Sequence, residues 1–211
     1  NMITLKLLGS DASITKTIHT AIAKSINELI SKKKRKVEAK LRRAVRFWIT
    51  ATPEMQSLME KGIPNSLNSQ FGLRNIDAKG AVEAIVSSIV NSAEIKISKI
   101  NNKLTGKIEF NFQPSDLRNL LGLSEGHVVT EKGQDLHWLD WLLTKGNSTV
   151  IIGYTYSTSG DGRSGVGSMK KGGSFRVNPQ FSGTVNNNFI TRSLVSREQK
   201  VISILSEVLS A

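Results

Sequence analysis

The chain has 211 residues, no cysteine and a formal net charge of +12, from 29 Lys and Arg against 17 Asp and Glu. The lack of cysteine excludes disulfides and thiolate metal sites. No apolar run approaches the roughly 20 residues of a membrane-spanning helix, so we expect no membrane partner. The charge excess favours an acidic partner, nucleic acid above all, although a lysine-rich soluble protein would have the same totals. The length fits one large domain, or one domain with an added arm.

Residues 2–8 alternate well enough to predict a short strand, and residues 10–52 predict one long amphipathic helix. Apolar residues recur there at helical spacing: Ile14, Ile18, Ile22, Ile26, Ile30, Val37, Leu41, Ala44 and Trp48. Ser10 or Asp11 can cap the start of the helix. Pro53 can end it, because the residue before a proline is pushed out of the α conformation. At ~1.5 Å per residue the helix would be about 60 Å long.

The second half of this helix is strongly basic. Residues 31–46 hold nine Lys and Arg against one Glu, a local charge of +8. Helical spacing directs most of these cations away from the apolar stripe, so they form a positive face. This face can bind a polyanion or an acidic protein surface, or it can simply be a solvated charged surface without a partner. The residues expected to face nucleic acid are Lys32, Arg35, Lys36, Lys40, Arg42, Arg43 and Arg46.

The next part of the chain predicts helices and then a hairpin. Residues 54–61 suit further helical turns, residues 62–73 have the composition of a loop, and residues 77–92 return to helical spacing. The period then changes to two in residues 94–100 and 104–112, which predicts a β-hairpin that turns at Asn101-Asn102.

The last part predicts short elements around one glycine-rich loop. Residues 115–123, capped by Ser115, and residues 136–143 suit short helices, and Gly146 suits a left-handed helix end. Residues 149–156 predict a buried strand, residues 157–173 a long glycine-rich loop, residues 174–177 a further strand, and residues 196–209 a C-terminal amphipathic helix.

This order of elements predicts an α+β fold. We expect a long N-terminal basic amphipathic helix, a small antiparallel β-sheet body with short helices, and a C-terminal helix. The predicted division is residues 2–61 for the N-terminal strand and helix, and residues 74–211 for the body.

Candidate catalytic and cofactor motifs are weak. Gly160-Asp161-Gly162-Arg163-Ser164-Gly165 matches the dinucleotide fingerprint G-x-G-x-x-G, but the residues that follow cannot easily form the helix whose N-terminus would face the pyrophosphate. The favoured interpretation is a loop that is mobile or is ordered by a partner. His137 and Asp140 have the spacing of a pair on a short helix, yet a structural histidine is favoured over a metal ligand. Because no nucleophile motif occurs, we expect no enzyme activity, no cofactor and no metal.

Four stretches of the sequence are distinctive: KGQDLHWLDWLL at 132–143, RSG at 163–165, SFRVNPQFSGT at 174–184 and NNNFITRSL at 186–194. Together they resemble virion structural proteins of tailed bacteriophages, of the neck or tail-completion (head–tail connector) kind. In that group a basic helical part precedes a small β-rich body. The resemblance covers residues 122–194, and Gly-Asp-Gly stands before Arg-Ser-Gly where the family usually has a proline.

The resemblance implies a non-enzymatic virion structural protein at the phage head–tail junction that self-associates in a ring around the DNA channel. It implies neighbouring portal, connector or tail proteins, nonspecific contact with DNA, and assembly into the virion in the host cytoplasm. The positive face would then offset phosphate repulsion without reading bases. The same face supports an alternative hypothesis, a nonspecific nucleic-acid-binding protein that uses helix face 32–46.

In the connector hypothesis, exposed side chains of the body anchor neighbouring subunits. The candidates are Arg163, Phe181, Phe189 and Arg192, with Trp138 and Trp141 beside them. The aromatic residues can instead belong to the core of the body, and for the two tryptophans we favour the core.

Overall fold

The computed structural model describes residues 9–112, 114, 116–130 and 133–210, so the strand predicted for residues 2–8 and the cap predicted at Ser115 lie outside the described residues. The fold is α+β, as predicted. The helices are α1 (Asp11–Thr50), α2 (Pro53–Met59), α3 (Leu67–Gln70), α4 (Asn75–Ser92), α5 (Arg118–Leu121), η1 (Ser124–Gly126), α6 (Trp138–Leu143), α7 (Phe189–Leu194) and α8 (Glu198–Ser210). The strands are β1 (Glu94–Ile97), β2 (Ile108–Asn111), β3 (Val128–Val129), β4 (Asp135–Leu136), β5 (Thr149–Ser157) and β6 (Ser168–Arg176).

The long helix α1 has the predicted length and the predicted start. Ser10 is its N-cap, and the Ser10 side chain accepts a hydrogen bond from the Ser13 N–H at 3.3 Å. At the other end, Thr52 caps α2 and Pro53 is the first residue of α2. Proline is well suited to that position because the N–H that it lacks would have no helical partner there. Pro53 therefore separates two helices and also begins the second one.

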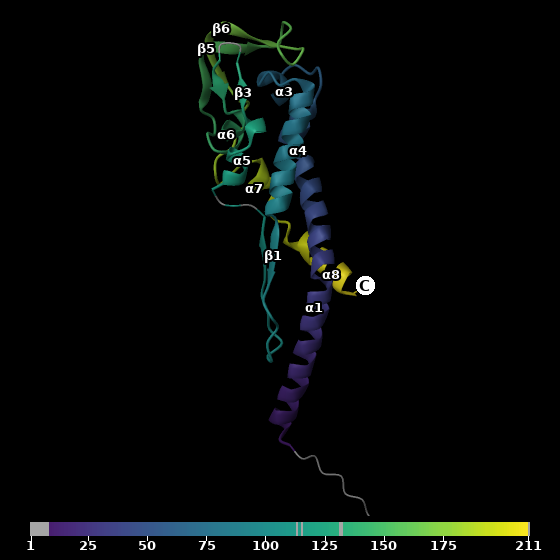
Figure 1. Cartoon of the computed structure of the whole chain (residues 1–211). Coiled ribbons are helices and arrows are strands. Elements are labelled where there is room, and N and C mark those ends of the chain that lie inside the picture. Colours follow the sequence, from purple (N-terminus) through teal and green to yellow (C-terminus); the bar gives the residue numbers. More distant parts are fainter. Residues whose placement is uncertain (1–8, 113, 115, 131–132, 211) are drawn as a thin grey trace, which may run out of the picture.

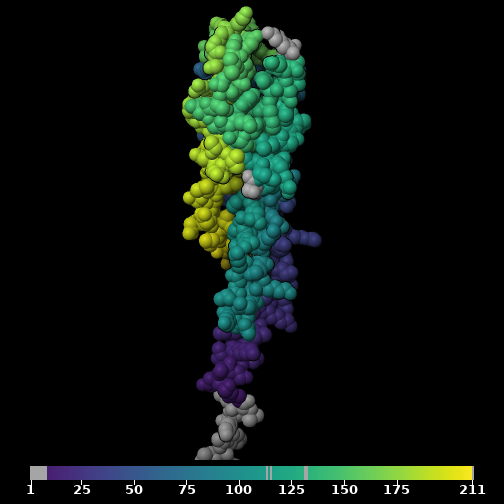
Figure 2. Space-filling view, turned by 90° about the vertical axis from the view of Figure 1, so that its left-hand side faces the viewer, coloured from purple at the N-terminus to yellow at the C-terminus, as the bar shows by residue number. Residues whose placement is uncertain are grey.

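The two halves of α1 have different surroundings. Val37, Leu41 and Val45 are buried in the second half, which packs against α4, α7 and α8. The first half extends beyond the body beside the β1–β2 hairpin (Figure 1). There the Asn27 side chain donates to the Ile100 carbonyl at 2.9 Å and accepts from the Ile100 N–H at 2.8 Å. Figure 2 shows from another side how the molecule narrows toward this end.

One hydrophobic core runs through the body. It includes the second half of α1, the buried Met55 and Leu58 of α2, the inner face of α4, and the short helices around Trp138 and Phe189. The second half of α1 and all of α2 therefore belong to the body, so this core does not divide between residues 61 and 74 as the predicted domains would. Only the first half of α1, with its hairpin, projects.

The predicted β1–β2 hairpin is confirmed, with an antiparallel register that pairs Ile95 with Phe110 and Ile97 with Ile108. Its turn is longer than the predicted two residues. The Asn101 side chain accepts hydrogen bonds from the N–H groups of Lys103 and Thr105, at 2.9 and 3.2 Å.

Several predicted boundaries were wrong. The predicted loop 62–73 contains the short buried helix α3. The helix predicted for residues 115–123 is only α5, preceded by Leu117 in a left-handed conformation. Leu136 lies in β4 rather than in the helix predicted from that residue. These elements are so short that tertiary packing, rather than local propensity, decides their conformation.

The glycine-rich segment forms a strand over much of its length. β5 and β6 pair as an antiparallel hairpin, so only residues 158–167 connect them. The predicted loop 157–173 and the predicted strand start at residue 174 were therefore wrong. β5 is also not fully buried, because Ile152 is 85% exposed while its neighbour Ile151 faces inward. The pairing shifts register between Ile152 and Tyr154, where Gly153 has φ +85°.

The last two helices agree with the sequence pattern. Asn188 and Thr191 form a capping box at the start of α7. The predicted C-terminal helix is α8, which buries Val201 and Val208 on the side that packs against α1. Within the part of the chain that the structure describes, no helix combines the length and the apolar character needed to cross a bilayer.

Candidate functional site

Seven cations of α1 were predicted to face nucleic acid, and the structure divides them into two groups. Lys40 forms a salt bridge with Glu207 of α8, and Arg46 forms a bidentate pair with Glu83 of α4, at 3.0 Å for both bonds. The hydrogen bond from Arg46 holds the pKa of Glu83 below its usual value, and the hydrogen bond from Lys40 does the same for Glu207. These two cations hold α4 and α8 to α1.

The other five cations are exposed and make no salt bridge with a described side chain. At about 100° per residue they share an arc of roughly 120° opposite the buried Val37 and Leu41. We call this surface the basic arc; it consists of Lys32, Arg35, Lys36, Arg42 and Arg43. An unneutralised row of cations on a rigid helix produces a positive potential that attracts polyanions.

An exposed apolar strip lies beside the basic arc. Ile18 is 52% exposed and Ile22 is 40% exposed, and Leu29 and Phe47 are also exposed. At about 100° per residue these four side chains lie within roughly 40° of one another around the helix. We call them the apolar strip. Leu29 and Phe47 were not predicted as part of an exposed apolar surface, because they lie off the predicted stripe. In the sequence, this surface is indicated only by Ile18 and Ile22, whose positions wind away from the buried face of the helix.

The predicted anchors in the body are only partly exposed. Phe189 is fully buried and Phe181 is nearly so, which contradicts their assignment as exposed anchors of this chain. The reason is local, since the capping box at Asn188 begins α7 with Phe189 turned into the core. Trp138 is buried, as the core interpretation expected, and Trp141 packs partly buried against the core.

The two predicted arginines are on the surface but are engaged within the chain. Arg192 of α7 forms an ion pair with Glu54, whose side chain is 3% exposed. Arg163 donates from Nη1 to the Val129 carbonyl at 2.6 Å. Arg192 therefore has a structural partner, while Arg163 makes no salt bridge with a described carboxylate.

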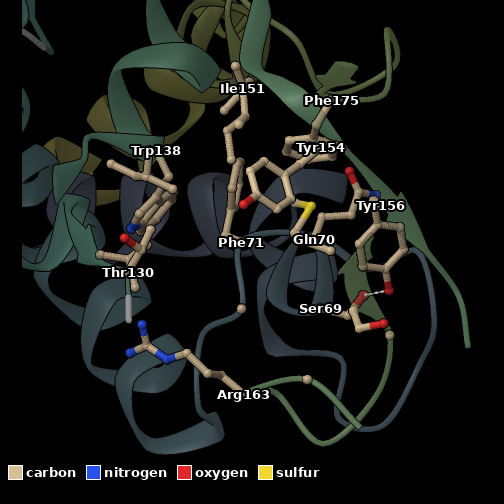
Figure 3. Close-up of a pocket in the computed structure, with 18 of the residues that line it drawn as sticks. Ser69, Gln70, Phe71, Thr130, Trp138, Ile151, Tyr154, Tyr156, Arg163 and Phe175 are labelled. Carbon is tan, nitrogen blue, oxygen red and sulfur yellow. Dashed lines mark hydrogen bonds between the residues drawn. The ribbon is translucent and has the colours of Figure 1, made fainter. Parts of the chain in front are cut away.

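A cavity of about 420 Å³ lies at the end of the body away from the start of α1. Its walls come from the α3 region, the segment around β3 and β4, Trp138 of α6, and the β5–β6 hairpin. Figure 3 shows the rings of Phe71, Trp138, Tyr154 and Phe175 around the space. This cavity was not predicted from the sequence, because its lining is assembled from segments that are far apart in the chain and share no motif.

The connection between β5 and β6 closes one side of the cavity. Tyr156 donates to the Ser69 hydroxyl at 2.8 Å and accepts from the Asn65 N–H at 3.3 Å, which ties the hairpin to the α3 region. Gly167 has φ +68°, and a Cβ there would lie 2.1 Å from the Tyr156 Oη. Glycine at this position therefore permits the close approach of backbone and ring.

The G-x-G-x-x-G stretch lies in this connection and is followed by β6 instead of a helix. The stretch thus lacks the helix N-terminus on which a pyrophosphate would sit. Among the described residues, no three His, Asp or Glu side chains are placed to hold a metal ion.

The histidines outside α1 form a stacked pair. The rings of His127 and His137 have centroids 3.9 Å apart, and the Nδ1 of His127 contacts the Asp135 carboxylate at 2.9 Å. Burial, and then the nearby His127, lower the pKa of His137. The candidate pair of His137 and Asp140 shows no hydrogen bond between the two side chains, and Asp140 pairs with Lys145 at 3.2 Å.

Comparisons of this chain with family models, with curated proteins and with solved structures gave no match.

Proposed function

We propose that the chain is a non-enzymatic virion structural protein at the phage head–tail junction, of the neck or tail-completion kind, which self-associates in a ring around the DNA channel. The observation that carries the proposal is the projecting half of α1 with three residues of its apolar strip, Ile18, Ile22 and Leu29. Exposed apolar side chains on one face of a helix that leaves the body favour a protein partner. The resemblance of residues 122–194 to neck proteins suggests the assembly in which this partner is a neighbouring subunit.

The proposal assigns separate roles to the two surfaces of α1. The apolar strip packs against a neighbouring copy, since that buries Ile18 and Ile22 from water. The basic arc beside it faces the channel, where Lys and Arg offset phosphate charge without base contacts. The virion is the proposed location, with portal, connector or tail proteins as further neighbours.

The basic arc also supports a second candidate, a nonspecific nucleic-acid-binding protein. Lys32 and Arg35 are exposed and form no salt bridge with a described side chain, and Lys36 interacts only with Glu207, which Lys40 already pairs. In this candidate the chain binds duplex DNA by itself, and affinity falls steeply with salt because bound counterions are released from the DNA.

The solution mass distinguishes the two candidates. Light scattering would follow the mass over a concentration series, with and without duplex DNA, for the parent and for a variant with Lys32, Lys36, Arg42 and Arg43 changed to Gln. The ring proposal predicts a mass that rises with protein concentration, ignores DNA and survives in the variant. A mass increase that needs DNA, disappears by a few hundred millimolar salt and is lost in the variant would replace it with the nucleic-acid binder.

A further inference from the structure

The cavity has the size and the lining of a small-molecule site. Its volume of about 420 Å³ falls in the range of about 300–1,000 Å³ that is common for such sites. Phe71 and Trp138 have ring centroids 5.3 Å apart, and Tyr156 and Phe175 have centroids 6.4 Å apart. Both pairs contribute to the lining. Aromatic walls of this kind complement a planar apolar group.

An unpartnered donor in the wall indicates that the ligand carries an acceptor. Trp138 is 0% exposed, and its indole Nε1 has no hydrogen-bond partner among the described residues. The indole N–H can only donate, and a buried donor without a partner destabilises the protein. Figure 3 shows this indole in the wall that also holds Thr130. Because the Trp138 side chain has no exposed surface, a ligand oxygen reaches this donor only after the neighbouring side chains shift, and it then satisfies the donor.

A cation at the rim sets the charge of the ligand. Only one hydrogen bond of the Arg163 guanidinium is taken up among the described residues, by the Val129 carbonyl, so other N–H groups of its fork remain for a carboxylate. Asp161 also lines the cavity. Its negative charge repels a dianion such as phosphate more strongly than a singly charged carboxylate.

We propose that the cavity binds a planar aromatic carboxylate. The ring packs against the wall that Phe71 and Ile151 form, an oxygen on the ring accepts from the Trp138 indole N–H, and the carboxylate pairs with Arg163. This site is independent of ring assembly, because it lies in the body and shares no residue with the apolar strip or the basic arc.

Three related compounds test the two polar contacts separately: 6-hydroxy-2-naphthoate, 2-naphthoate without the ring hydroxyl, and 2-naphthol without the carboxylate. Binding would be followed in ¹H–¹⁵N spectra of the full chain. The indole N–H signal of Trp138 is assigned by its loss in Trp138→Phe, and it should move downfield on addition of 6-hydroxy-2-naphthoate. Backbone amide shifts near the cavity give the affinity in the variants.

Each variant should affect only the compounds that use the contact it removes. Arg163→Gln should weaken both naphthoates about tenfold and leave 2-naphthol unchanged. Trp138→Phe keeps an aromatic side chain but removes the indole N–H, so it should weaken 6-hydroxy-2-naphthoate about tenfold more than 2-naphthoate.

Neighbouring residues of β5 provide a matched pair of controls. Ile151→Phe puts bulk into the cavity and should abolish binding, whereas Ile152→Phe changes a side chain that is 85% exposed and should preserve it. Thermal unfolding checks that all variants fold. The proposal is overturned if millimolar 6-hydroxy-2-naphthoate leaves the Trp138 signal in place, or if Arg163→Gln weakens 2-naphthol as much as the naphthoates.

Discussion

Among single residues, Glu54 depends most clearly on one partner. This carboxylate is almost fully buried in α2, and its ion pair reaches Arg192 of α7, far along the chain. From the sequence, Arg192 was predicted to be an exposed interface residue. Nothing in the sequence around Arg192 indicates that the fold places the buried Glu54 next to it. The burial of Phe181 and Phe189 has the same origin, since the pattern shows that they are apolar but not which surface covers them.

We expect Arg192→Ala to lower the free energy of unfolding by about 3 kcal/mol, because it leaves a buried charge without a partner. Arg74 provides the control, since its salt bridge with Asp77 is exposed on both sides, and Arg74→Ala should cost less than about 1 kcal/mol. Urea unfolding followed by circular dichroism measures both. Equal effects of the two substitutions would show that the Glu54 pair contributes no more than a surface pair.

The stacked histidines predict a pH dependence. Burial lowers the pKa of His137 in the folded chain, whereas an unfolded histidine has a pKa of about 6.5. The unfolded state therefore takes up the proton first as the pH falls, so the stability present above about pH 6.5 is lost below it. The melting temperature should decline between pH 7 and 5 and decline less in His137→Gln. His19→Gln on the projecting half of α1 is the control, and it should follow the parent. A parent whose melting temperature is flat over this interval would contradict the prediction.

At the scale of elements, the sequence predicted the ones whose signals are local. The length of α1 follows from its apolar spacing, its start from Ser10, and its end from Pro53. The first part of β6, residues 168–173, was not predicted because its glycines have low strand propensity and its pairing with β5 is a contact between separate segments. The cavity was missed for a related reason, since its walls meet only after the helices and hairpins have packed.

The two halves of α1 should respond differently to substitution. Ile18→Gln combined with Ile22→Gln places good helix formers at two exposed positions. The double variant should leave the stability of the monomer within about 0.5 kcal/mol of the parent, and it should remove self-association. Leu41→Ala, in the packed half, should cost about 2–5 kcal/mol. Chemical unfolding and sedimentation measure the two effects. If the Gln variant still self-associates as the parent does, the apolar strip is not the contact surface.

The β5–β6 connection provides a second matched pair. Gly167 and Gly165 both have positive φ, but an added Cβ meets Tyr156 only at Gly167. Gly165→Ala should cost about 1 kcal/mol, from backbone strain alone. Gly167→Ala should cost more and should expose Tyr156, which is measured by its hydrogen exchange and by thermal unfolding. Equal costs at the two positions would show that the close approach to Tyr156 does not constrain the hairpin.

For the whole molecule, the two ends are built for different contacts. The body has a continuous core and a cavity, while the projecting half of α1 has little covering it apart from the β1–β2 hairpin and exposes apolar side chains. A heterologous contact, in which one surface packs on a different surface of the next copy, generates a closed ring when its rotation closes. The proposed function requires a closed ring. The contact between the apolar strip and the next copy, repeated from copy to copy, must therefore bring the last copy into contact with the first.

The mass of the assembly by native mass spectrometry tests this central claim most directly. At high protein concentration and without DNA, the account predicts one discrete species at a whole-number multiple of the 23.1 kDa chain, and the species should disappear in the Ile18→Gln, Ile22→Gln variant. A chain that stays monomeric at every concentration, or an open series of masses without a preferred multiple, would contradict a closed ring built through α1.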